Sequence, residues 1–185
     1  EKLDNQFRSL RTHGTTKSKD QLEKFDGQWY YEMHHLGYNY RITDFQCALG
    51  INQLKKLDMF IKVRRQIAKI YDNKFSTLSY VKTPDLKYPF NHAYHLYPLQ
   101  IFFDEIKITK TEFFDKMKES GISLQVHYIP IHLQPYYQKN YGFKAGEYPV
   151  CESFYKNELS LPIYPDLSED DLNNVMNNVI KYLSL

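Results

Sequence analysis

Apolar residues recur every three or four positions in several stretches of the chain, a spacing that places them on one face of a helix. The first stretch, residues 3–10, is followed by Gly14 and predicts a short helix that stops near that glycine. A second stripe covers residues 43–75, with no proline or glycine after Gly50. It predicts one uninterrupted helix of roughly 45 Å, at about 1.5 Å per residue.

Capping patterns mark the start of three helices. In each, a Ser or Thr can accept a hydrogen bond from the backbone three residues on, and in the first two a Gln or Glu at that position can return the bond. The three pairs are Thr43-x-x-Gln46, Thr109-x-x-Glu112 and Ser168-x-x-Asp171. Residues 147–159 predict one more helix, with Pro149 in its first turn, where the missing N–H breaks no hydrogen bond.

Strand patterns lie between these helices. Residues 94–103 (YHLYPLQIFF) predict a strand that Pro98 confines to a sheet edge or a bulge. Residues 122–128 alternate apolar and polar side chains, the period of a half-buried strand. A short strand is also predicted at 29–32, inside an irregular, aromatic-rich loop. The second half of the chain is therefore predicted to be an α+β layer, with helices over a short antiparallel or mixed sheet.

A domain boundary is predicted at residues 81–93 (VKTPDLKYPFNHA), where two prolines and a Pro-Asp turn signal interrupt the pattern. The two parts are then residues 1–80 and 81–185. The first part has a helix, a long loop and a second helix, which do not make a core of their own. We expect it to pack on something absent from this chain.

Composition excludes several classes of protein. The 185 residues carry 24 Lys and Arg against 22 Asp and Glu, and a net charge of +2 is too small to predict a nucleic-acid or membrane partner. No apolar run approaches the ~20 residues of a membrane span. Two distant cysteines, Cys47 and Cys151, favour a reducing compartment. We therefore expect a soluble, cytoplasmic protein with no nucleic-acid or membrane partner.

Motifs for metal ions and phosphate loops are missing from the sequence. Seven histidines are present, but no H-E-x-x-H motif or cysteine pair accompanies them, so no metal site is expected. Neither G-x-x-x-x-G-K-S/T nor G-x-G-x-x-G occurs.

Two segments are candidates for binding chemistry. In Gly37-Tyr38-Asn39-Tyr40-Arg41, the guanidinium and the amide could serve an anion such as a phosphate, just before a helix cap. The alternative is a salt bridge from Arg41 to Asp44 with tyrosine packing around it.

The second candidate segment is His127-Tyr128-x-Pro130-x-His132, which ends a predicted strand in a loop shaped by proline. Loops at strand ends are common places for binding sites. The alternative is a structural loop that is filled with aromatic rings.

The amino-acid sequence resembles that of a known family. The segments LGYNYRITDFQCALGINQLKKLD, AYHLYPLQI, GISLQVHYIPIHLQPYY, GEYPVCE and LSLPIYPDLSEDD occur in the order typical of the DegT/DnrJ/EryC1/StrS sugar aminotransferases. These are pyridoxal phosphate enzymes of the aspartate aminotransferase fold, fold type I, which is α/β overall. The resemblance implies that residues 1–80 are the tail of the large cofactor-binding domain, with a dimer-crossing loop and a long linking helix. It implies that 81–185 are the small C-terminal α+β domain.

The resemblance also implies roles for single residues. Asn39 and Arg41 match residues that reach the cofactor phosphate across a dimer interface, and Arg41 also matches a substrate contact. His127 and Tyr128 match the loop that lines the nucleotide-sugar site, with His132 as a companion. No lysine of this chain lies in the motif of the Schiff-base lysine, which is expected upstream, so this chain alone is expected to be inactive.

The implied function is that of the C-terminal portion of a homodimeric enzyme with shared active sites. With pyridoxal 5'-phosphate, it would transfer an amino group, with glutamate the expected donor, to C4 of a UDP-4-keto-6-deoxy-N-acetyl-hexosamine. The segment VHYIPIHLQPYY most resembles the sequences of the family branch that serves pseudaminic acid biosynthesis. The alternative is a truncated or degenerate interaction module of the same fold that binds no cofactor.

Overall fold

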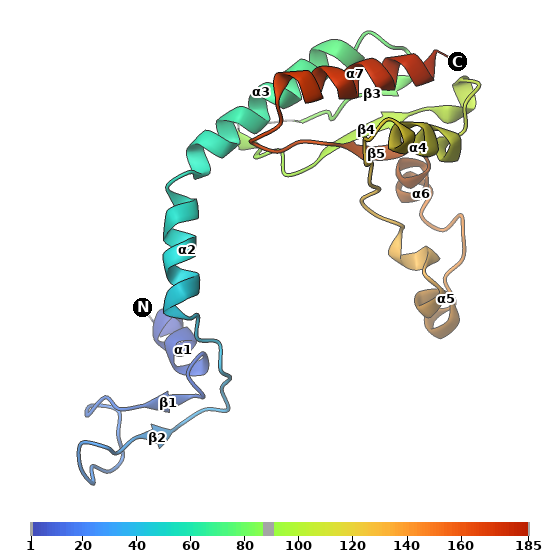
Figure 1. Cartoon of the computed structure of the whole chain (residues 1–185). Coiled ribbons are helices and arrows are strands. Elements are labelled where there is room, and N and C mark those ends of the chain that lie inside the picture. The colour runs from blue at the N-terminus through green and yellow to red at the C-terminus, as the bar shows by residue number, and fades with distance from the viewer. Residues whose placement is uncertain (1, 87–90, 185) are drawn as a thin grey trace. The chain divides into compact units, whose positions relative to one another are not determined.

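The computed structural model describes residues 2–86 and 91–184, and the chain divides into two compact units at Lys55/Lys56 (Figure 1). The sequence placed the boundary at 81–93, of which 87–90 lie outside the described residues. The two divisions differ because residues 57–75 form a helix whose inner face lies in the core of the second unit.

The first unit contains two helices and a two-stranded ribbon. Helix α1, predicted from the apolar spacing, covers Lys2–Leu10. Strands β1 (Thr15–Thr16) and β2 (Glu32–Met33) pair in antiparallel fashion. The strand predicted at 29–32 thus lies further along the chain, because the earlier residues belong to the loop between the strands. Helix α2 covers Asp44–Leu54.

Two glycines hold the GYNYR segment against the end of α1. Gly14 has a φ of +69°, and a Cβ on it would overlap the carbonyl group of His35. A Cβ on Gly37 would likewise overlap the backbone of Gly14. Because neither residue carries a side chain, the backbones approach closely, and Tyr38 donates its N–H to the carbonyl of Leu10 at 2.7 Å.

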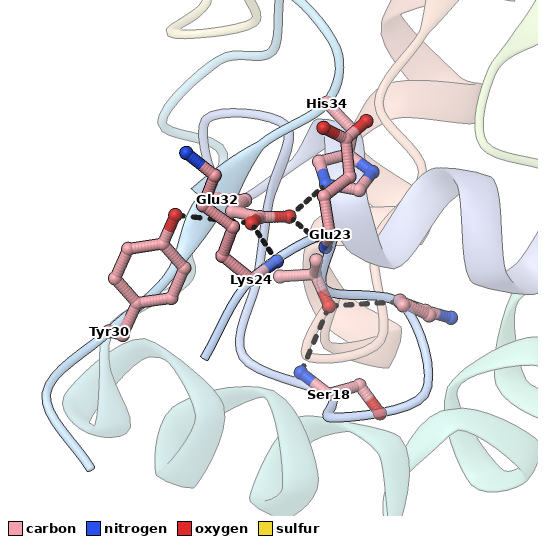
Figure 2. A network of polar contacts seen from close by, with 8 residues as sticks. Ser18, Glu23, Lys24, Tyr30, Glu32 and His34 are labelled. Atoms are coloured by element: carbon pink, nitrogen blue, oxygen red, sulfur yellow. Dashed lines mark hydrogen bonds and ion pairs between the residues drawn. The ribbon is translucent and has the colours of Figure 1, made fainter. Parts of the chain in front are cut away.

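One carboxylate orders the loop between β1 and β2 (Figure 2). Glu32 accepts the backbone N–H groups of Glu23 at 2.7 Å and Lys24 at 2.9 Å, and the Tyr30 hydroxyl at 3.1 Å. Nε2 of His34 lies 2.8 Å from the same carboxylate. Chiefly through this contact with His34, the pKa of Glu32 falls from 4.5 to about 2. The loop therefore closes on a group that stays ionised far below neutral pH.

The single helix predicted over residues 43–75 is wrong. The predicted capping box of Thr43 and Gln46 is confirmed, but α2 ends at Leu54 and α3 covers Leu57–Phe75. The two lysines between them keep right-handed backbone angles, and no side chain caps α3. No proline or glycine marks this break. It separates α2, which has no buried residue, from α3, which buries four in its second half, the first of them Ile67.

The second unit contains a three-stranded antiparallel sheet with the order β3-β4-β5. The strands cover Val81–Lys82, Tyr97–Ile101 and Glu158–Leu161. The prediction that Pro98 lies on an edge strand or a bulge is wrong, since β4 is central and pairs with β5 at Pro98. Proline is tolerated because β3 pairs only with Gln100 and Ile101 and does not extend to Pro98.

Strand β5 replaces the end of a predicted helix. The helix expected over 147–159 is α6, Pro149–Asn157, and the next four residues are strand. Residues 122–128 show the predicted alternation, with Ile122 and Leu124 buried, but they form only one bridge, Gln125 with Ser160. The ladder stops there because the backbone N–H of His127 donates to the Glu158 side chain instead.

The remaining helices complete the α+β layer. Helix α4 (Lys110–Glu119) has the predicted capping box of Thr109 and Glu112, and Ser168 caps α7 (Glu169–Leu183) as predicted. Short helices occur in the loops: η2 at Phe103–Glu105, η3 at Ile131–Leu133 and α5 at Pro135–Tyr141. Helix α7 packs against both α3 and α4. The largest fully buried side chains are Tyr71, Tyr97, Phe75, Phe113 and Leu99.

Replacing Leu99 tests this core. Leu99 is fully buried on β4, so Leu99→Ala should lower the free energy of unfolding by about 2–5 kcal/mol, from lost burial and the cavity left behind. Val150→Ala is the control, because Val150 is 84% exposed on α6 and should change stability by no more than about 0.5 kcal/mol. Urea denaturation followed by circular dichroism measures both, and equal effects would contradict the assigned core.

Replacing Glu32 tests the loop network. In Glu32→Gln the amide nitrogen is itself a donor, so the four donors can no longer all be accepted. Hydrogen exchange at the amides of Glu23 and Lys24 should become faster. Glu23→Gln is the control, because that side chain is exposed and should leave exchange unchanged. Equal protection in Glu32→Gln and the parent protein would show that the carboxylate does not order the loop.

The lowered pKa gives this network a pH dependence of known sign. Because the folded pKa of Glu32 is depressed from 4.5 to about 2, the contribution of the carboxylate is complete above pH 4.5 and lost as the pH falls through about 2. Protection of the two amides, corrected for intrinsic exchange, should therefore hold at pH 4.5 and fall below it. Glu32→Gln should lack this step.

Candidate functional site

Arg41 lies in the first unit, between the ribbon and the cap of α2. Its Nε donates to Oδ1 of Asn39 at 3.1 Å, and its Nη2 lies 3.5 Å from Nε2 of His13. The rings of Tyr38 and Tyr40, the residues on either side of Asn39 in the sequence, stack with centroids 5.1 Å apart. The structure therefore places the side chains of Asn39 and Arg41 in contact.

The alternative role for Arg41 was a salt bridge to Asp44. Within residues 2–86, the ion pairs that the structure shows do not include these two side chains. Arg41 is exposed, and a neutral amide and an imidazole are its side-chain partners. A guanidinium without a carboxylate partner keeps its charge and its paired N–H groups for an external anion.

His127 lies in the second unit at the edge of β5. Its backbone N–H donates to Oε2 of Glu158 at 3.0 Å, and its Nδ1 lies 2.8 Å from Oγ of Ser160. The Ser160 hydroxyl in turn donates to Oε1 of Glu158 at 2.8 Å. Glu158 is fully buried, whereas the His127 ring is half-buried. One end of the imidazole is thus held by the strand.

Tyr128 follows His127 through a cis peptide bond, and the two rings meet edge-on with centroids 4.7 Å apart. The Tyr128 side chain is 75% exposed. A large aromatic ring at that exposure, next to a held imidazole, suits a ligand that offers both apolar and polar surface.

His132 has a different environment. It is buried on η3, its Nε2 lies 2.8 Å from Oε1 of Glu152 on α6, and its ring packs against Tyr148. This contact with His132 is the main cause that lowers the pKa of Glu152. Glu152 also accepts the backbone N–H of Gly146. The ring therefore ties the loop to α6.

Sequence reasoning missed the carboxylates behind these histidines. Glu158 lies 31 residues from His127, and Glu152 lies 20 residues from His132, so no local spacing connects them. Polar and apolar residues alternate in Glu158–Leu161, which could have predicted a strand with Glu158 on its polar face. The helix pattern directly before it concealed this signal.

Metal-ligand clusters and membrane-spanning helices are absent from residues 2–86 and 91–184. No three His, Cys, Asp or Glu side chains there are arranged to hold a metal ion. The helices of this part of the chain are too short or too polar to cross a membrane.

Known structures share this fold along nearly the whole chain. PseC of Helicobacter pylori, an aminotransferase involved in the biosynthesis of pseudoaminic acid, matches with a TM-score of 0.81 at 27% identity. The match covers 100% of this chain and 47% of that one. The PMP form of Spr1654 of Streptococcus pneumoniae, described as a sugar aminotransferase, matches with a TM-score of 0.82 at 25% identity, covering 99% and 45%; a PLP form also matches. The fold is part of the aspartate aminotransferase-like, type I fold.

Curated sequences agree with the structural match. An uncharacterized protein of Methanocaldococcus jannaschii is 42% identical over all of this chain and 48% of its own length. The UDP-4-amino-4,6-dideoxy-N-acetyl-beta-L-altrosamine transaminase of Campylobacter jejuni is 36% identical over 99% of this chain and 46% of its own. The chain thus spans about half the length of the curated relatives it matches. The model of the DegT/DnrJ/EryC1/StrS aminotransferase family matches residues 1–180, and the chain belongs to this family.

Proposed function

We propose that the chain is the C-terminal portion of a pyridoxal phosphate-dependent nucleotide-sugar aminotransferase. The observation that carries the proposal is the exposed apolar surface of the first unit, considered with family membership. Within residues 2–55 only Gly14 is buried, and neither α1 nor α2 contains a buried residue. Relatives that match the whole chain are about twice as long.

The exposed side chains need a partner surface. Burying one large apolar side chain contributes about 1.5–3 kcal/mol, so a unit that leaves so many in water is not stable alone. Those on the two helices are Leu3, Phe7, Phe45, Leu49, Ile51 and Leu54. We infer that the rest of a large cofactor-binding domain covers them, with the Schiff-base lysine in that missing part.

The GYNYR segment fits a phosphate. Arg41 can donate two parallel N–H groups to phosphate oxygens, and Asn39 fixes the guanidinium from the side through Nε. When bound, pyridoxal phosphate supplies the electron sink for amino-group transfer. Asn39 and Arg41 would bind and orient the phosphate, and Arg41 would also contact the substrate. In the proposed homodimer these residues serve a site shared with the second subunit.

His127 and Tyr128 fit a nucleotide sugar. The proposed acceptor is a UDP-4-keto-6-deoxy-N-acetyl-hexosamine, aminated at C4 with glutamate as donor. The support is the transaminase function named for the Campylobacter relative, together with the exposed Tyr128 ring that lies beside the His127 imidazole. His132 would support this loop through Glu152. Free Cys47 and Cys151 agree with action in the cytoplasm.

The mass of the native polypeptide tests whether this chain is the C-terminal portion of a longer protein. We expect about twice the 22.2 kDa of this chain, since the relatives are about twice as long. Mass spectrometry of the purified native protein measures it, and visible absorbance after addition of pyridoxal phosphate reports cofactor binding. A native polypeptide of 22.2 kDa that stays colourless would instead support a non-catalytic interaction module.

Replacing Arg41 tests the anion role. Hydrogen bonds to charged groups contribute about 1.5–3 kcal/mol, so Arg41→Ala in the complete protein should weaken cofactor or substrate binding roughly tenfold or more. Spectroscopic titration with pyridoxal phosphate and the KM for the nucleotide sugar measure the two effects. Arg8→Ala is the control, because Arg8 pairs with Asp4 on the surface of α1. Unchanged affinity for both ligands would remove Arg41 from the site.

A further inference from the structure

The contacts around Glu158 determine the direction of a hydrogen-bond chain. This fully buried carboxylate accepts the backbone N–H of His127 with Oε2 and the Ser160 hydroxyl with Oε1. An ionised carboxylate has only acceptors, so both neighbours must donate to it. The single proton of the Ser160 hydroxyl is therefore committed to Glu158.

The remaining contact of Ser160 then needs a proton from the imidazole. Oγ of Ser160 lies 2.8 Å from Nδ1 of His127, and the hydroxyl has no second proton to donate. The proton in this contact must lie on Nδ1. A neutral imidazole has only one N–H, so its Nε2 is an acceptor.

We infer that Glu158 and Ser160 are positioning residues that hold the proton of His127 on Nδ1 and leave Nε2 to accept a hydrogen bond from a ligand. With Glu158 ionised, the three contacts have this direction independently of any ligand.

The ligand part of the inference rests on the proposed function. If His127 contacts the nucleotide sugar, the group that faces Nε2 of the neutral ring is a donor, namely a sugar hydroxyl or an acetamido N–H. A carbonyl or carboxylate oxygen at that position would not bind to the neutral ring. The strand thus determines which polar group of the sugar is accepted.

The tautomer can be measured directly. Solid-state 15N NMR of the complete protein, labelled at its histidine imidazole nitrogens, distinguishes protonated from unprotonated ring nitrogens at any molecular mass. His127→Gln identifies the His127 signals by their loss. At a pH about two units above the usual histidine pKa of about 6.5, we expect Nδ1 protonated and Nε2 unprotonated. The opposite tautomer would overturn the inference.

Glu158→Gln should reverse the direction of the hydrogen bonds that connect residue 158, Ser160 and His127. The new amide oxygen must accept the backbone N–H of His127, so the amide nitrogen faces Ser160 and donates to its oxygen. The hydroxyl proton is then free to point to Nδ1 of His127, and the ring proton moves to Nε2. Glu119→Gln, the same change on an exposed residue of α4, should leave the tautomer unchanged. An unchanged tautomer in folded Glu158→Gln would contradict the inference.

A second variant covers the case in which Glu158→Gln does not fold. Ser160→Ala removes the acceptor of the Nδ1–H group, so the fixed tautomer should give way to a mixture of both forms. A ring still protonated wholly on Nδ1 would show that Ser160 does not hold it.

Kinetics separate this inference from the proposed function. With the ring proton on Nε2, two donors face each other, so the KM for the nucleotide sugar should rise about tenfold in Glu158→Gln, with a smaller change in kcat. A reversed tautomer with an unchanged KM would overturn the ligand part alone. A complete protein without aminotransferase activity would contradict the proposed function, and the NMR result would still test the hydrogen-bond chain.

Discussion

The pairing of β5 with β4 is the interaction on which the second unit depends. Side chains alternate along a strand, and all four residues of β5 are buried. Leu159 and Leu161 belong to the apolar core, while Glu158 and Ser160 alternate with them and hold His127. A single short strand therefore provides both packing and the fixed end of the imidazole. A shift of register by one residue would exchange leucines and polar groups.

Local interactions were the part of the fold that the sequence determined well. The capping boxes at Thr43 and Thr109 involve residues three positions apart, so the pattern contains the whole interaction. The break between α2 and α3 has no such signal, because Lys55 and Lys56 are ordinary helix formers. β5 was missed because its four residues directly follow a helix.

The candidate site likewise has residues that the sequence could indicate and contacts that only the tertiary structure shows. The proposed site residues from the family resemblance are Asn39, Arg41, His127, Tyr128 and His132. The structure shows which side chains contact them. Glu152 and Glu158 could not be predicted from the sequence, because the contacts with their histidines depend on the tertiary fold. The same holds for Gly14 and Gly37. Only the folded structure shows that a Cβ at either position would overlap the backbone of another segment.

The Glu32 network makes the path of the loop largely independent of the side chains at two of its positions. Two of the four donors are the backbone N–H groups of residues 23 and 24, which every amino acid except proline provides. Substitutions at these positions can change the surface that the loop presents while its path stays the same. The carboxylate therefore fixes the path of the loop without restricting the side chains that the loop exposes at these two positions.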